Sequence, residues 1–230
     1  MLTAFGTNIW IADGPQVVAG LGFHYPTRMA VVRLDGDELF IWSPTALTPE
    51  LGSATDALGR VAYLVAPNTL HDTFIADWKR AYPAAVVHAA PGLAAKRTDI
   101  AFDAELGETP APGWAGEIEQ VVFGGNAITT EIVFFHRASG TVLFTDLLQQ
   151  FPPGWFSGWR AFIARWDLMV SPRPAVPRKF RIAFRKKALA RAAIGKVLAW
   201  PVQKVILAHG APVTEDGRDA IAEAFRWLTG

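Results

Sequence analysis

Two pairs of β-rich apolar segments, each joined by turn residues, form the clearest pattern along the chain. Residues 29–34 and 39–43 flank Asp35-Gly36, a dipeptide that favours a tight turn between strands. About a hundred residues later, residues 131–136 and 141–145 again flank a short polar segment that ends in glycine. The pattern predicts two β-hairpins and hints at a duplicated architecture.

Shorter apolar runs, bounded by Gly, Pro or Asn, occur between and after the hairpins. Since they do not alternate with polar residues, they predict strands that are buried on both faces. These runs are residues 61–66, 86–89, 118–123 and 205–208.

Helical periods separate the strands. Apolar residues share one face between 155 and 166, and again between 221 and 228, after Thr214 as the expected N-cap. A third helix is predicted from about residue 180 to residue 200, where Pro201 ends it. Strands mixed with helices, with the central strands covered on both sides, predict a layered α/β sandwich. The proline-rich stretches are short, so we expect one domain over 1–230.

Composition narrows the classes of function. The chain has 230 residues, 51% of them hydrophobic, with 22 basic and 21 acidic residues and no cysteine. The absence of cysteine excludes disulfide scaffolds, cysteine nucleophiles and iron–sulfur clusters. The N-terminus lacks a basic leader pattern, and no apolar run approaches the roughly 20 residues of a membrane span, so we expect a cytoplasmic protein.

Two segments differ from the average composition of the chain. Ten basic residues and no acidic residue lie between Arg173 and Lys204, and the part from Arg178 to Lys187 could bind an anionic surface weakly. The alternative is a solvated helix face. No recognised nucleic-acid-binding motif accompanies it, so a nucleic-acid partner is not expected. The second composition is a dense aromatic cluster at 151–166, for which we expect core packing rather than a pocket or dimer contact.

Polar residues of metal-binding type follow three of the predicted strands. The run 61–66 leads into Asn68, His71 and Asp72, the run 142–145 into Asp146, and the run 205–208 into His209. Functional residues gather where strands end in α/β sheets. Imidazoles and carboxylates bind Zn, Fe or Mn, but each of these residues could instead cap a turn or bond a carbonyl. His24 could face the same cleft, although a surface position is the alternative, and His136 is expected to be exposed.

The order of these motifs resembles the metallo-β-lactamase superfamily. It consists of the polar loop after a strand, Gly124-Gly125-Asn126 before a hairpin, the segment 143–148 around Asp146, and Ile206 to Gly210 around His209. The Asn-x-x-His loop and residues 78–83 are more similar to an uncharacterised branch, a domain of unknown function. The resemblance implies a four-layer αββα sandwich of two mixed sheets.

The same resemblance implies site residues. Asp146 matches the bridging carboxylate and His209 the last histidine of the family. The first motif departs from the family, because Asn68 to Thr73 offers one histidine and one aspartate in place of three histidines and an aspartate, and Asn126 takes the place of a further histidine. A two-metal centre is therefore not expected.

Two hypotheses follow. In the first, the protein is a metal-dependent hydrolase with at most one Zn or Fe ion on His71, Asp146 and His209, with Asp72 and Asp146 as catalytic carboxylates. Its substrate would be a small ester, thioester or phosphate-bearing molecule. In the second, the cluster holds no metal, and a non-catalytic protein binds a small anion or a protein partner through its cleft or basic helix. The oligomeric state is left open.

Overall fold

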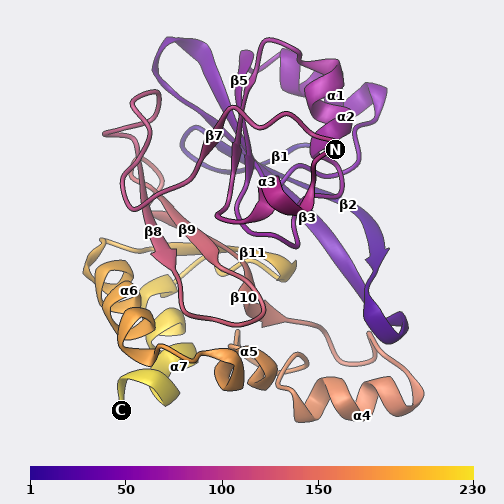
Figure 1. Ribbon diagram of the computed structural model, residues 1–230, viewed down its shortest axis with the longest axis vertical. Coiled ribbons are helices and arrows are strands. Elements are labelled where there is room, and N and C mark those ends of the chain that lie inside the picture. Colours follow the sequence, from indigo (N-terminus) through magenta and orange to yellow (C-terminus); the bar gives the residue numbers. More distant parts are fainter.

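The computed structural model describes residues 1–230 and contains two β-sheets that pack against each other (Figure 1). The first sheet has seven strands in sequence order: β1 (Thr3–Gly6), β2 (Ile9–Val18), β3 (His24–Arg33), β4 (Glu38–Trp42), β5 (Arg60–Ala66), β6 (Val86–Ala89) and β7 (Ala104–Glu105). β1 to β4 pair antiparallel, and β4 to β7 pair parallel. The sheet is therefore mixed.

The second sheet has four strands in the order β11, β10, β9, β8. Their bounds are β8 (Ile118–Phe123), β9 (Glu131–His136), β10 (Thr141–Gln150) and β11 (Lys204–Gly210). β10 pairs antiparallel with β9 and parallel with β11, so this sheet is mixed too. The carboxyl ends of β10 and β11 consequently lie side by side.

The core between the sheets is built from their inward-facing apolar side chains. Phe40 and Trp42 project from the first sheet, and Phe134 and Leu143 project from the second. All four are almost completely buried, and the rings of Phe40 and Phe134 meet edge to face with centroids 5.5 Å apart. Burial of such large side chains stabilises the face-to-face packing.

Helices cover both outer faces. α1 (Pro49–Asp56), α2 (Ile75–Ala81) and α3 (Leu93–Lys96) pack on the first sheet. α5 (Arg178–Ala183), α6 (Lys187–Ala199) and α7 (Gly217–Thr229) pack on the second, where Phe225 contacts Phe144. α4 (Gly158–Trp166) lies at the periphery (Figure 1). The layers follow the order αββα, as predicted.

Both predicted hairpins and all four short strands are present, but the predicted helix over 180–200 is interrupted. α5 ends at Ala183 and α6 begins at Lys187. Between them Phe184 forms a bridge with Asn126, and the Arg185 N–H donates to the Gly125 carbonyl at 2.9 Å. These contacts take the backbone out of the helical hydrogen-bond pattern, which the apolar period alone does not reveal. The longest helices have 13 residues, and none is long and apolar enough to cross a bilayer.

Candidate metal centre

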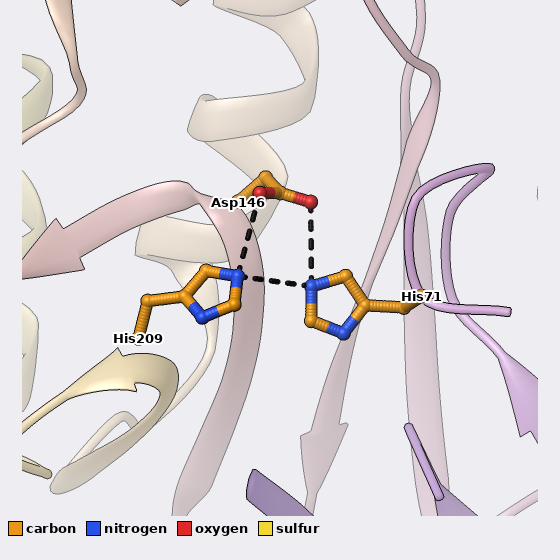
Figure 2. Close-up of side chains that lie close together, drawn as sticks. All are labelled: His71, Asp146 and His209. Carbon is orange, nitrogen blue, oxygen red and sulfur yellow. Dashed lines mark hydrogen bonds and ion pairs between the residues drawn. The ribbon is translucent and has the colours of Figure 1, made fainter. Parts of the chain in front are cut away.

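Three side chains that are far apart in the sequence meet at one edge of the sandwich (Figure 2). His71 lies in the loop after β5, Asp146 lies within β10, and His209 lies near the end of β11. Each has a side chain that is at least nine-tenths buried. The sequence predicts each of them just after a strand, but β10 continues to Gln150, so Asp146 lies inside its strand. The three side chains nevertheless come together.

The three ligand atoms form a compact triangle. The Nε2 atoms of His71 and His209 are 3.2 Å apart, Asp146 Oδ2 is 3.3 Å from His71 Nε2, and Asp146 Oδ1 is 3.5 Å from His209 Nε2. Ligands held at about 2.0–2.2 Å by one tetrahedral centre are separated by about 3.3–3.6 Å. The triangle therefore matches one face of such a tetrahedron, which leaves the fourth position free of protein ligands.

The hydrogen positions and charges of the three side chains also suit a cation site. His209 Nδ1 lies 2.8 Å from the Pro26 carbonyl, which only accepts, so Nδ1 carries a hydrogen and Nε2 is the ring atom that faces the other two groups. Burial lowers the pKa of His71, so its ring is neutral at neutral pH. Burial disfavours the Asp146 charge, but the facing imidazoles hold the pKa of Asp146 well below its usual range.

An irregularity in β10 presents Asp146 to the site. β10 and β11 pair regularly up to Phe144 and Leu207, and pairing resumes only at Gln149 and His209. The intervening residues of β10 thus bulge out of the ladder and lose their strand partners. Asp146 lies inside this bulge.

Glu131 replaces the missing backbone partners. Its carboxylate is fully buried and accepts hydrogen bonds from the backbone N–H groups of Thr145, Asp146 and Leu147 at 2.8, 2.9 and 3.0 Å. Burial, with added repulsion from Asp146, raises the pKa of Glu131 to about 7. Glu131 therefore fixes the backbone that carries Asp146 without facing the triangle itself.

Asn68 joins the loop of His71 to the bulge of Asp146. Its side-chain oxygen accepts from the backbone N–H of Leu70 and of His71, at 2.8 and 2.9 Å. Its side-chain nitrogen donates to Asp146 Oδ2 at 2.7 Å and to Thr145 Oγ1 at 2.8 Å. All four contacts are made by a completely buried amide, so Asn68 orients two of the three candidate ligands.

The remaining contacts orient the two histidines. Ser43 Oγ lies 2.8 Å from His71 Nδ1 and fixes the ring from behind. Gly210 follows His209 with a φ of 143°, and a Cβ at this position would lie 2.3 Å from the Gln150 carbonyl oxygen. Glycine is therefore required for β11 to approach the end of β10 this closely.

A cavity of about 280 Å³ opens onto the triangle. Its lining includes the apolar residues Val17, Leu70 and Phe74 and the basic residue Lys179. Lys179 Nζ donates to the Tyr25 hydroxyl at 3.0 Å and lies 3.6 Å from buried Asp167. Burial raises the pKa of Tyr25, so its hydroxyl is protonated at neutral pH. The cavity thus combines three candidate metal ligands, one cation and an apolar wall.

Three further residues from the sequence analysis lie elsewhere. Asp72 pairs with Lys96 at 3.1 Å and Arg97 at 3.3 Å, and it does not line the cavity. Asn126 donates to the Phe180 carbonyl at 3.0 Å and ties its loop to α5. His24 Nε2 lies 3.1 Å from the Trp155 carbonyl, and the Trp155 indole donates to the His24 carbonyl. Asp72, Asn126 and His24 are therefore separate from the triangle.

The sequence analysis missed Ser43, Glu131, Lys179 and Tyr25 as parts of the site. Glu131 begins a strand and Ser43 ends one, and neither position carries a local pattern that indicates a buried contact with a distant loop. Lys179 was noticed only as one of many basic residues. Their roles arise from tertiary contacts.

Solved structures with the same fold are metallo-β-lactamase-fold proteins. The mono-zinc form of the metallo-β-lactamase FIM-1 from Pseudomonas aeruginosa is 14% identical, with a TM-score of 0.64 over 100% of this chain and 96% of that chain. A metallo-β-lactamase from Pontibacter korlensis is 13% identical, with a TM-score of 0.66 over 100% and 99% of the two chains. The metal-soaked Flv1 flavodiiron core from Synechocystis is 12% identical, with a TM-score of 0.67 over 100% of this chain and 60% of that chain.

These likenesses establish a metallo-β-lactamase-like fold and, at such low identity, only the fold. No curated protein matches the sequence. The model of the family described as domain of unknown function (DUF4336) matches residues 7–157. The chain belongs to this family.

Proposed function

We propose that the protein is a metal-dependent hydrolase with one divalent ion held by His71, Asp146 and His209. The observation that carries this proposal is the triangle of ligand atoms with sides of 3.2, 3.3 and 3.5 Å. Two imidazoles and one carboxylate are a ligand set that Zn and Fe accept, and three protein ligands are typical of catalytic rather than structural sites.

Electrostatics support a bound cation as well. His209 Nε2 faces a carboxylate oxygen at 3.5 Å and a second imidazole nitrogen at 3.2 Å. Electron-pair donors brought together out of water repel one another unless a positive charge lies between them. When bound, a divalent ion at such a site lowers the pKa of a coordinated water to about 7 and polarises a carbonyl or phosphoryl oxygen.

The chain's own residues limit what the cavity accepts. Its volume of about 280 Å³ fits a small substrate. The Lys179 ammonium fits an anionic group on that substrate, and the apolar wall around Leu70 and Phe74 fits a hydrocarbon part and excludes water. A small ester, thioester or phosphate-bearing molecule combines these properties.

The test is elemental analysis of protein purified without an affinity tag or chelator, followed by a screen of chromogenic esters, thioesters and phosphodiesters. We expect close to one equivalent of Zn, Fe or Mn in the natural protein and none in an Asp146→Ala, His209→Ala double variant. A His24→Gln variant is the matched control, because it removes a histidine outside the triangle. No metal after incubation with excess Zn²⁺ or Fe²⁺ would overturn the proposal.

One observation favours a second candidate, a non-catalytic protein that binds a small anion in the same cavity. Hydrogen bonds can satisfy much of the cluster without an ion, since Ser43 can donate to His71 Nδ1 and His71 Nε2–H can then donate to His209 Nε2. Lys179 would then be the group that holds the anion. Metal-free protein that binds inorganic phosphate, and loses this binding on Lys179→Met, would identify this candidate.

A further inference from the structure

The helix α4 presents an apolar face to solvent. Trp159, Phe162, Ile163 and Trp166 follow a spacing of three and four residues, so they lie on one side of the helix. Their exposed fractions are 50, 68, 38 and 58%, respectively. The expectation that aromatic residues at 151–166 pack in the core thus holds for Phe151 and Phe156, whereas the helix places its two tryptophans outside.

The turn between β2 and β3 extends this face. Leu21 is 76% exposed and has a φ of 60°, a left-handed conformation that is costly for a branched side chain. Arg160 Nε donates to the Leu21 carbonyl at 2.8 Å, and the rings of Phe23 and Trp159 meet at 5.8 Å. We call Leu21, Trp159, Phe162, Ile163 and Trp166 together the α4 face.

Two guanidinium groups lie against the tryptophan rings of the α4 face. The Arg160 guanidinium lies 4.7 Å from the centre of the Trp159 ring, and that of Arg178 lies 5.5 Å from the Trp166 ring. The sole acidic residue between positions 151 and 214 is Asp167. It is 4% exposed, accepts from the Lys179 backbone N–H and lies beside the Lys179 ammonium, so it offers no carboxylate to a partner.

We infer that the α4 face is a docking site for an anionic lipid surface. Tryptophan and phenylalanine beside arginine, without exposed carboxylates, match the boundary between acyl chains and acidic headgroups. Val18 and Ala19, next to the turn of Leu21, line the cavity of the candidate metal centre. Docking would therefore hold the edge of this cavity close to the lipid.

The experiment is vesicle co-sedimentation of the full chain. We expect binding to phosphatidylcholine vesicles that contain about 30 mol% phosphatidylserine, with weaker binding to pure phosphatidylcholine and at high salt. A Trp159→Ser, Phe162→Ser, Trp166→Ser variant should lower the partition coefficient at least about tenfold. Arg165 is a further exposed basic residue of α4. Arg165→Glu, which leaves the apolar side chains in place, should lower the partition coefficient on anionic vesicles alone.

Matched controls are Leu189→Ser on α6 and Arg80→Glu on α2, which change an exposed apolar and an exposed basic residue on other layers. Both should bind like the natural protein, and circular dichroism should show that all variants are folded. Binding that the triple α4 variant retains, or no binding to anionic vesicles at all, would overturn the inference. A dimer seen by light scattering that the triple variant converts to monomer would overturn it too, because a second copy would then cover the face.

Discussion

The β9–β10 hairpin buries a histidine-containing polar cluster at each of its two ends. At the turn, which we call the closed end, the hydrogen bonds stay within the hairpin. At the opposite end, which we call the open end, the contacts run to other strands and loops. At the turn, His136 Nδ1 pairs with Ser139 Oγ at 2.8 Å, and Ser139 pairs with Thr141 at 2.8 Å. Each of these groups is uncharged and has a neighbour within the hairpin. At the other end, Asp146 faces two imidazole nitrogens that come from different strands and loops.

The comparison shows that burial of a histidine does not by itself define a site. His136 is 1% exposed, more deeply buried than His209 at 4%, and the partner of its Nδ1 lies in the same hairpin. The expectation that His136 is exposed is wrong, because Ser139 and Thr141 provide a polar lining for it inside the sandwich. What separates the two ends is where the facing groups come from: Asp146 faces imidazole nitrogens of two distant segments, whereas His136 pairs within its own hairpin.

The largest expected effect concerns Glu131, which holds the open end of the hairpin. Glu131→Ala removes the acceptor of three buried backbone N–H groups, so we expect the free energy of unfolding to fall by about 3–5 kcal/mol. Urea denaturation measures this change. Ser139→Ala at the closed end, which removes one hydroxyl from a neutral cluster, should cost about 1 kcal/mol.

Glu131→Gln is the control that separates charge from shape. It retains one carbonyl oxygen in place of the carboxylate, so it should recover part of the stability that alanine loses. If Glu131→Ala were less destabilising than Ser139→Ala, the bulge of β10 would not depend on this carboxylate, and the contrast between the two ends would fail.

The next effect is a pH dependence that belongs to the closed end. Burial lowers the pKa of His136 to about 4, below the value of about 6.5 of an unfolded chain. The unfolded chain therefore takes up the proton first, so the contribution to stability is complete above about pH 6.5 and is lost as the pH falls toward 4. The loss should amount to about 3 kcal/mol.

Unfolding measured from pH 4 to pH 8, in the natural protein and in His136→Gln, isolates this contribution. The variant lacks the titrating ring, so the difference between the two profiles should shrink by about 3 kcal/mol as the pH falls through this window. If the free energies of unfolding of the two proteins stay parallel across the pH range, the ring accepts a proton in the folded state as readily as in the unfolded chain. The cluster at the turn would then not exclude a charged histidine.

Features of the fold that depend on local sequence patterns could be predicted, and features that depend on contacts between distant segments could not. The hairpins, the buried strands and the three ligand positions have local patterns: an apolar run, a turn, or a polar residue at the end of a strand. β2 lacks such a pattern, because Asp13, Gly14 and Pro15 interrupt its apolar residues and a register shift follows Gly14. Nothing in the sequence analysis indicated this strand.

The contacts that support the candidate ligands could not be predicted from the sequence, for a physical reason. Glu131 becomes important because β10 bulges out of the ladder fifteen residues later, and the apolar run that predicts the strand contains no sign of the bulge. For α4, the period defines which residues share a face, and it does not define whether another element covers that face. Exposure of Trp159 and Trp166 is therefore a property of the assembled fold.

The smallest expected effect tests how the open end orients His71. Ser43→Ala and Ser43→Gly both remove the hydroxyl at 2.8 Å from His71 Nδ1, so both should lower zinc affinity about tenfold by freeing the ring. Competition with a chromogenic chelator measures this affinity. An affinity equal to that of the natural protein in both variants would show that Ser43 does not orient His71.

The two variants at this position should still differ in stability. Ser43 has a φ of 49°, a left-handed conformation that glycine adopts at little cost and alanine does not. Ser43→Gly should therefore be about 1 kcal/mol more stable than Ser43→Ala in urea, although both bind zinc equally. Equal affinity with unequal stability would assign the metal effect to the lost hydroxyl rather than to the backbone. If the less stable variant also bound zinc more weakly, the backbone at the end of β4 would instead be what positions His71.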